Sequence, residues 1–221
     1  MTPDRQLYGL ALHTSSPQLG LAISNFSSDS RERSADGPRN RTWDLGRELS
    51  AQLHLLLTEF IKPQTWKDLT FIAVATGPGS FTGTRMGVVT ARTLAQQLDI
   101  SLFPVSSLAA IARSHSSVEF SNIAIQMPAQ RGQLFTAIYE VNAQGVTPLL
   151  PDGARAPDIW QQTLDHWETP YQLIVAPADR GASAFSVLEL AHLNWQLGIR
   201  PSWQDALPFY GQHPVKTDPA T

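Results

Sequence analysis

A glycine-rich stretch constrains the fold of this chain more than any other part of the sequence. It reads Gly77-Pro78-Gly79-Ser80-Phe81-Thr82-Gly83 and follows an apolar run at 71–75 that predicts a buried strand. A helical pattern then continues to about Leu98. A glycine-rich turn between a strand and a helix exposes backbone N–H groups at the positive helix end, where an anion can bind. The stretch therefore predicts a strand–turn–helix unit whose turn is either a weak phosphate site or a tight connection with nothing bound.

The turn departs from the common nucleotide-binding loops. It is not followed by Gly-Lys-Ser/Thr, and position 82 is threonine where the dinucleotide fingerprint has its third glycine. Ser80 is not in a Gly-x-Ser-x-Gly setting, so we expect a turn or cap hydroxyl rather than a nucleophile. The residues that would form a weak phosphate site are Gly77, Gly79, Ser80, Thr82 and Gly83.

The predicted helix carries a stripe of small residues. Gly83, Gly87, Ala91 and Ala95 recur every four positions, so another backbone can approach this face closely. Arg85 lies nearby and could carry charge to a partner. The stripe packs either against the same chain or against another one, and the pattern leaves both possibilities open.

The remaining pattern predicts an α/β chain. Apolar runs at 7–12 and 19–24 predict a β-hairpin, the polar stretch 27–41 predicts a loop, and leucines that include Leu49 and Leu53 predict a helix from 45 to about 61. Further strands are expected at 102–105, 122–126, 134–141 and 172–176, helices at 106–114, 158–167 and 182–197, and an extended tail over 201–221.

Composition excludes several classes of function. Hydrophobic residues make up 42% of the chain and charged residues 16%, which is typical of a globular protein. The formal net charge of −3 argues against a protein that binds mainly by neutralising phosphates. Cysteine is absent, and the six histidines are too scattered to form a zinc pair one helical turn apart. No catalytic set and no metal site emerge.

The sequence also predicts a cytoplasmic location. Met1 to Gln6 is polar and lacks the apolar core of a signal peptide. No apolar run approaches ~18 residues, so we expect no membrane contact.

Several motifs together carry a family resemblance. They are Gly77-Pro78-Gly79-Ser80-Phe81-Thr82-Gly83-Thr84-Arg85-Met86-Gly87, then Thr90-Ala91-Arg92-Thr93-Leu94-Ala95, Val105-Ser106-Ser107-Leu108 and the opening Leu10-Ala11-Leu12-His13-Thr14-Ser15. By these motifs the chain resembles the TsaB (YeaZ) family, a non-catalytic relative of the TsaD enzyme of bacterial tRNA threonylcarbamoyladenosine synthesis. The likeness extends from residue 7 to about 113 and is weaker beyond, where Pro208-Phe209-Tyr210 resembles the closing Pro-x-Tyr of the family.

The resemblance implies an actin-like, Hsp70-like ATPase fold (ASKHA) with two lobes of mixed sheet flanked by helices. The expected division is an N-terminal lobe at 1–105, a smaller α/β lobe at 106–204 and a tail at 205–221. Relatives with ATPase activity hold nucleotide and magnesium with an aspartate in the first hairpin, where this chain has His13, and position 128 is proline. Because a neutral imidazole does not replace a carboxylate for magnesium, we expect no cofactor and no enzymatic activity.

The resemblance further implies a scaffold role. Such a subunit pairs as a heterodimer with a TsaD-type transferase that modifies ANN-decoding tRNAs, a TsaE-type ATPase completes the complex, and tRNA is met only through the complex. Without the partner, a homodimer through the same surface is expected. The predicted interface lies on the two N-lobe helices and comprises Leu49, Leu53, Gly83, Arg85, Gly87, Ala91 and Ala95.

Two other functions remain as alternatives. One is a small kinase or ATPase of the same fold that uses the glycine turn for phosphate. The other is a metalloprotease, which the scattered histidines and the missing cysteines disfavour.

Overall fold

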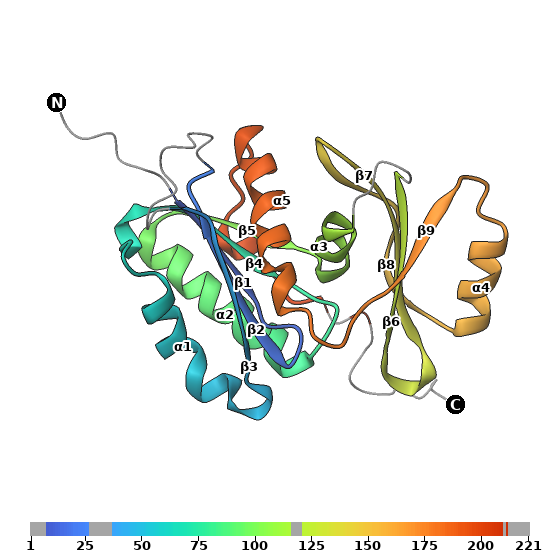
Figure 1. Cartoon of the computed structure of the whole chain (residues 1–221), viewed down its shortest axis with the longest axis horizontal. Coiled ribbons are helices and arrows are strands. Elements are labelled where there is room, and N and C mark those ends of the chain that lie inside the picture. Colours follow the sequence, from blue (N-terminus) through green and yellow to red (C-terminus); the bar gives the residue numbers. More distant parts are fainter. Residues whose placement is uncertain (1–7, 27–36, 116–120, 210, 212–221) are drawn as a thin grey trace, which may run out of the picture.

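The chain of 221 residues folds around two β-sheets that lie side by side along the long axis of the molecule (Figure 1). The structure is a computed structural model, and it describes residues 8–26, 37–115, 121–209 and 211. The first sheet has five strands in the order β3-β2-β1-β4-β5, and the second has four in the order β8-β7-β6-β9. The predicted two-lobed α/β architecture is therefore present.

The elements follow the chain in two groups. Those up to the second sheet are β1 (Tyr8–His13), β2 (Gln18–Ser24), β3 (Arg39–Asp44), α1 (Leu49–Phe60), β4 (Leu69–Ala75), α2 (Phe81–Leu98), β5 (Ser101–Val105) and α3 (Ser107–Ser114). Those that follow are β6 (Asn122–Pro128), β7 (Leu134–Asn142), β8 (Gly145–Arg155), α4 (Pro157–Asp165), β9 (Tyr171–Val175) and α5 (Ala184–Gln196). Short 3-10 turns lie at Gly46–Glu48, Trp66–Asp68, Gln130–Gly132, Gly181–Ser183 and Trp203–Asp205.

The central strands of the first sheet are buried on both faces. β1 pairs with β2 as the antiparallel hairpin that the sequence predicts, and with β4 in parallel. Since side chains alternate along a strand, Leu10 and Leu12 face the core beneath α1 and α2, whereas Ala11 faces the core beneath α5. Helices therefore cover both faces of this sheet, as buried parallel strands require.

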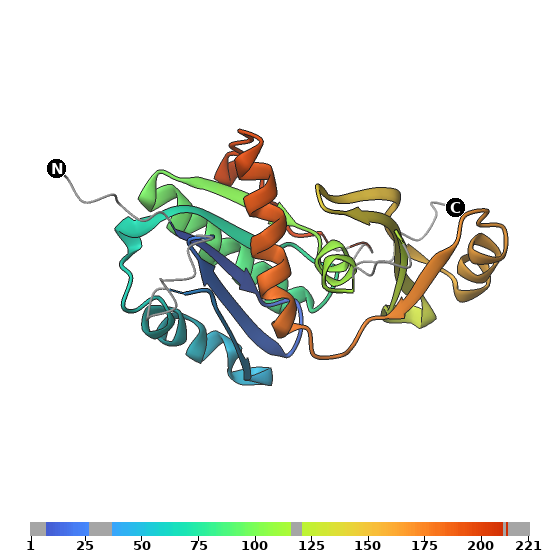
Figure 2. The same ribbon diagram turned by 45° about the horizontal axis from the view of Figure 1, so that its top comes forward.

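Helix α5 belongs to the first sheet, although it comes last in the chain. Val187 and Ala191 of α5 are completely buried against the face that carries Ala11. Figure 2 shows α5 lying across the first sheet, while α4 lies at the far end of the molecule beside the second sheet. Helix α5 and the turn at 203–205, which lie in and after the predicted second lobe, pack mainly with residues 8–105, and α5 also contacts β8 of the second sheet.

The second sheet is covered by one helix on each face. Ile123 and Ile125 of β6 share a core with α3, whereas Ala124 faces Trp160 and Leu164 of α4. Helix α3 also contacts α5, so it joins the two halves of the molecule.

Two strands were not predicted. β3 includes residues 39–41 of the predicted loop; it is a polar edge strand without an alternating apolar pattern, and its register on β2 runs from Gln18–Asp44 to Ile23–Arg39. β8 was also missed, because it is an edge strand with Pro148, Pro151 and Gly153 and an irregular register on β7. Residues 27–36 of the predicted loop lie outside the described residues.

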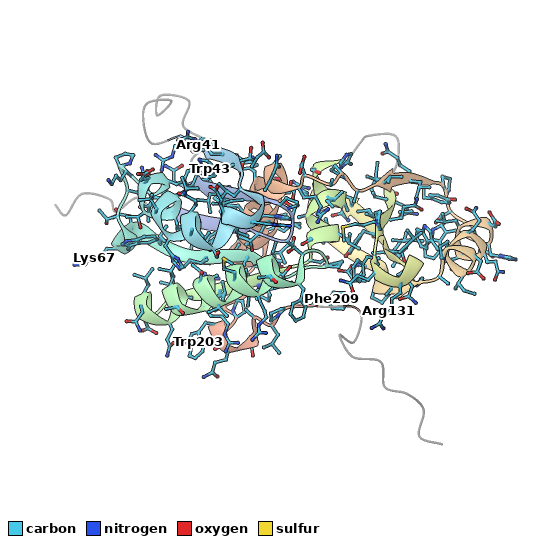
Figure 3. The ribbon with its side chains drawn as sticks, turned by 90° about the horizontal axis from the view of Figure 1, so that it is seen from below. Arg41, Trp43, Lys67, Arg131, Trp203 and Phe209 are labelled. Atoms are coloured by element: carbon cyan, nitrogen blue, oxygen red, sulfur yellow. The ribbon has the colours of Figure 1, made fainter. Side chains whose placement is uncertain are left out.

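The C-terminal segment lies along α2. Trp203 packs against the core beneath α1 and α2, with the Arg92 guanidinium 5.4 Å from its ring centroid, and Ala206 is completely buried. The backbone N–H of Phe209 donates to the carbonyl oxygen of Thr76 at 2.7 Å. Figure 3 shows Trp203 beside α2 and Phe209 near the N-terminal end of that helix. Of the remainder of the predicted tail, residues 210 and 212–221 are outside the described residues.

Candidate functional site

A cleft of about 490 Å³ separates the two halves of the molecule on one side. The first hairpin and the glycine turn supply one wall, with Ser15, Ser16, Pro17, Gly79 and Ser80. The second half and its return to α5 supply the other, with Met127, Pro128, Ala129, Gln130, Phe135, Ala176, Ala178 and Arg180. The structure thus brings the hairpin turn, the glycine turn and the segment around Pro128 to one place, although they are far apart in the sequence.

The glycine turn is shaped to accept the hairpin turn. A Cβ added at Gly79 would lie 2.1 Å from the carbonyl oxygen of Ser15, and one added at Gly83 would lie 2.2 Å from the carbonyl oxygen of Thr14. Because real Cβ atoms do not approach backbone this closely, only glycine fits at either position. The glycines of this motif therefore serve close backbone packing.

Two of the backbone donors that could bind an anion at this turn are used within the chain. The N–H of Ser80 donates to the Ser15 carbonyl at 2.8 Å, and the N–H of Gly83 donates to the Ser80 hydroxyl at 3.2 Å. Ser80 is thus the N-cap of α2, as the sequence predicts. These bonds favour the tight connection over the predicted phosphate site at Gly77, Gly79, Ser80, Thr82 and Gly83.

His13 lies directly behind this cleft and is completely buried. Its Nε2 lies 3.2 Å from the Ser15 hydroxyl, which in turn lies 2.7 Å from the Ser107 hydroxyl, while its Nδ1 has no hydrogen-bond partner. Burial, reinforced by the nearby positive charge of Arg180, lowers the pKa of His13 to about 3. The imidazole is therefore neutral at physiological pH and serves as a structural polar group.

Arg180 fastens the second half of the chain to the hairpin turn. Its Nη2 donates to the Ser15 carbonyl at 2.7 Å and its Nη1 donates to the Pro177 carbonyl at 2.8 Å. Its backbone N–H also donates to the Ser16 hydroxyl at 3.3 Å. Sequence reasoning missed Arg180, because no local motif marks an arginine that bonds a carbonyl 165 positions away, that of Ser15.

The chemistry available at the cleft is limited. The described residues that line it include no carboxylate. Pro128 is one of these lining residues. Across the described part of the chain, no group of three or more His, Asp or Glu side chains is placed to hold a metal ion. A hard cation such as magnesium prefers oxygen ligands, usually carboxylates, and the described residues that line the cleft supply no carboxylate.

The predicted partner interface requires a correction. Gly83, Gly87, Ala91 and Ala95 are buried within the chain itself, because this stripe of α2 packs on β1 and β4. Leu49 and Leu53 are buried as well. Side chains that a single chain already covers cannot also contact a partner, and of the predicted interface residues only Arg85 is exposed.

The same two helices, together with Trp66 of the turn at 66–68, line an apolar groove of about 330 Å³. Its lining residues are His54, Leu57, Thr58, Trp66, Met86, Val89, Thr90, Thr93 and Leu94. Val89 is 58% exposed, and Leu55 on the outer surface of α1 is 56% exposed. The sequence contained one signal for this groove. Val89 is an apolar residue on the side of α2 away from the small-residue stripe, where a solvent-exposed helix face would normally be polar.

None of the described helices is long and apolar enough to span a lipid bilayer.

Comparison with known proteins gives consistent matches. The family model of TsaD, tRNA N6-adenosine threonylcarbamoyltransferase, matches residues 46–161. The TsaB tRNA threonylcarbamoyladenosine biosynthesis protein of Bacillus subtilis is 33% identical over 162 residues, which cover 73% of this chain and 67% of that protein. The TsaB of Buchnera aphidicola is 33% identical over 76 residues, 34% of this chain and 36% of that one.

Solved structures share the fold. A Pseudomonas aeruginosa protein described as similar to peptidase YEAZ aligns with a TM-score of 0.74 at 17% identity, over 93% of this chain and 99% of that one. The structure of YeaZ from Pseudomonas aeruginosa aligns with a TM-score of 0.71 at 17% identity, over 92% and 100%. Together with the TsaD family match, these alignments confirm the predicted actin-like α/β fold.

Proposed function

Because the chain belongs to the TsaB (YeaZ) family, whose members take part in tRNA threonylcarbamoyladenosine biosynthesis, we propose that it is a non-catalytic scaffold that pairs with a TsaD-type threonylcarbamoyltransferase. The observation that carries this proposal is the exposed apolar groove between α1 and α2. A TsaE-type ATPase joins the resulting complex, and tRNA is met through the complex.

The cleft supports the non-catalytic part of the proposal. It is lined, in the described residues, without carboxylates, and its neighbouring titratable group, His13, is buried and neutral. The glycine turn uses the N–H groups of Ser80 and Gly83 for its own packing. The fold therefore keeps the shape of a two-lobed ATPase, while the described residues of its cleft include no carboxylate that could position magnesium.

The groove supports the pairing. Val89, Met86 and Leu94 line it from α2, where Val89 is the most exposed apolar residue of the three, and His54 and Thr58 line it from α1. Exposed apolar side chains on two neighbouring helices suit a pair of helices from another chain, because ridges of one pair can fill the groove of the other. The same geometry allows two copies of this chain to pair when the transferase is missing.

The test is light scattering on a sizing column, with the full chain alone and with a TsaD-type transferase from the same organism. The informative variant is Val89→Glu, which places a charge in the groove at an exposed position. Val175→Glu is the matched control, since Val175 is 62% exposed on β9 of the second sheet. Urea unfolding of both variants checks that each remains folded.

We expect a one-to-one complex with the wild type and with Val175→Glu, and at least tenfold weaker association with Val89→Glu, because a buried unpaired carboxylate costs more than 1.4 kcal/mol. Equal binding by both variants would move the partner surface away from the groove. A wild-type chain that stays monomeric with the transferase present, and that hydrolyses ATP, would instead support an enzyme of this fold.

A further inference from the structure

The groove between α1 and α2 is bordered by more positive than negative charge. The segments 49–68 and 81–98 supply all of its lining residues. Apart from His54, their ionisable side chains are the cations Lys62, Lys67, Arg85 and Arg92 and the carboxylates Glu59 and Asp68. The four cations form a basic border, which is a local property of this surface because the whole chain has a net charge of −3.

Helix α2 places its two arginines beside Val89, the exposed apolar residue of the groove. Because successive helical residues turn by about 100°, Arg85 and Arg92 lie about 40–60° to one side of Val89. Met86 and Thr93, which line the groove, lie by about the same angle on its other side. The helix from Phe81 to Leu98 contains no aspartate or glutamate. A partner that packs on Val89 therefore meets two positive charges and no negative charge from α2.

Arg85 is available to such a partner. Its side chain is exposed, and within the described part of the chain it has no hydrogen-bond or ion-pair partner. Arg92 is half-buried, with its guanidinium 5.4 Å from the ring centroid of Trp203. The Asp68 carboxylate already accepts hydrogen bonds from the N–H and the hydroxyl of Thr65, each at 2.8 Å. The charge of Arg85 is thus left for a carboxylate of another chain.

We propose that the basic border selects the partner: the transferase surface that fills the groove carries carboxylates opposite Arg85, whereas a second copy of this chain is repelled. This inference rests on the proposed function, in which the groove binds the transferase. In a symmetric pair of identical chains the same surface patch lies on both sides of the interface, so two borders with the same excess of positive charge meet. Like charges disfavour that association, and opposite charges favour the heterodimer and speed its formation.

The apolar character of the groove favours a protein over RNA as its occupant. Positive charge by itself would also suit the phosphates of tRNA. The arginines, however, lie beside exposed Val89 and a groove that is also lined by Leu57, Met86 and Leu94. Covering these residues needs apolar side chains, which a phosphate backbone does not supply. Binding of tRNA is therefore the alternative that the experiment must exclude.

The test compares how the two associations respond to sodium chloride, at about 0.05 M and about 0.5 M, where charges are weakly and strongly screened. Surface plasmon resonance measures the association rate of the full chain with a TsaD-type transferase from the same organism. Sedimentation equilibrium measures self-association of the full chain, and filter binding measures its affinity for tRNA. Arg85→Glu reverses one charge of the border. Arg131→Glu is the matched control, at an exposed arginine of the second half, and urea unfolding checks that both variants fold.

We expect the heterodimer of the wild type to form about tenfold more slowly at high salt, because screening removes the electrostatic attraction. Arg85→Glu should slow its formation about tenfold at low salt and have little effect at high salt. Self-association should respond with the opposite sign: salt strengthens it for the wild type, and Arg85→Glu strengthens it at low salt. Arg131→Glu should match the wild type in both measurements.

The possible failures are distinguishable. A heterodimer that forms equally fast at both salt concentrations and with Arg85→Glu would overturn the basic border as a selector while leaving the proposed pairing intact. Self-association that weakens with salt would contradict the repulsion between two copies. Tight binding of tRNA by the chain alone, lost in Arg85→Glu, would assign the border to RNA. A wild-type chain that does not bind the transferase at either salt concentration would remove the proposed function, and this inference with it.

Discussion

The hydroxyl of Thr14 donates a hydrogen bond of 2.8 Å to the carbonyl oxygen of Gly83. This bond joins the turn of the first β-hairpin to the first turn of α2, between residues 69 positions apart. One helical turn further on, Gly87 leaves just enough room for the same threonine, since an added Cβ would lie 2.1 Å from its Oγ1. The turn of the hairpin therefore packs against the small-residue stripe of α2.

Gly87→Ala tests this packing. An alanine in a helix normally stabilises by up to about 1 kcal/mol relative to glycine, but here the added methyl collides with Thr14, and we expect a net loss of about 2 kcal/mol. Urea unfolding measures it. In the Thr14→Ala background the 2.1 Å contact with Oγ1 is removed and the tightest remaining contact is the 3.2 Å one with the Cβ of residue 14, so the same substitution should cost much less. A stabilising Gly87→Ala in the wild-type background would contradict the close approach.

His13 predicts a pH dependence of stability. Its pKa is about 3 in the folded chain and near 6.5 in the unfolded chain, so between these values the unfolded state takes up a proton that the folded state does not. The free energy of unfolding should therefore fall as pH drops below 6.5, by up to about 1.4 kcal/mol per pH unit from this group. Above pH 7 the contribution is constant.

His13→Asn removes this term, so the stability difference between wild type and variant should shrink by about 2 kcal/mol between pH 7 and pH 5. Urea unfolding across this range measures the difference. His166→Asn, at an exposed histidine of the second half, controls for the loss of an imidazole. A constant difference between wild type and His13→Asn would show that His13 can be protonated in the folded state.

Ser106 combines two roles that predict a large effect of its removal. Its hydroxyl accepts from the N–H groups of Leu108 and Ala109 as the N-cap of α3, and it donates to the Asp152 carboxylate at 2.5 Å. Burial raises the pKa of Asp152, and the hydrogen bonds from Ser106 and Tyr139 oppose that rise. Ser106→Ala should cost about 2–3 kcal/mol and raise the pKa of Asp152 further.

The matched control for Ser106→Ala is Ser80→Ala. Ser80 is an exposed N-cap that accepts one N–H, from Gly83 at 3.2 Å, so about 1 kcal/mol is expected. Chemical denaturation of both variants compares the two losses. Equal losses would mean that the bond from Ser106 to Asp152, which joins the two halves, contributes nothing to stability.

Arg180→Lys should be destabilising although it keeps the charge. The guanidinium reaches the Ser15 and Pro177 carbonyls at once, and one ammonium group cannot replace that fork, so we expect a loss of about 2 kcal/mol. Arg131→Lys, at the exposed arginine labelled in Figure 3, should stay within about 0.5 kcal/mol of the wild type. Similar losses of unfolding free energy for the two variants would contradict a stabilising role of the two Arg180 hydrogen bonds.

Local elements with strong patterns could be predicted from the sequence. The glycine turn, the hairpin, α1 and α2 appear where the apolar period and the caps indicate them, because these signals act between residues close in the chain. The polar edge strand β3 and the proline-bearing edge strand β8 could not be predicted in the same way. Their pairing depends on a neighbouring strand rather than on their own pattern.

The long motif around Gly77–Gly87 is enough to indicate the family, and the small residues from Gly83 to Ala95 are enough to predict that another part of a protein comes close to this helix. The fold shows which part comes close: it is Thr14 and the strands of the same chain. A stripe of glycine and alanine indicates that a neighbour packs closely against the helix, but it does not indicate which segment that neighbour is. Likewise, α5 packs on the first sheet and Arg180 meets Ser15 because the chain returns after the second sheet, and such long-range burial leaves no local periodic signal.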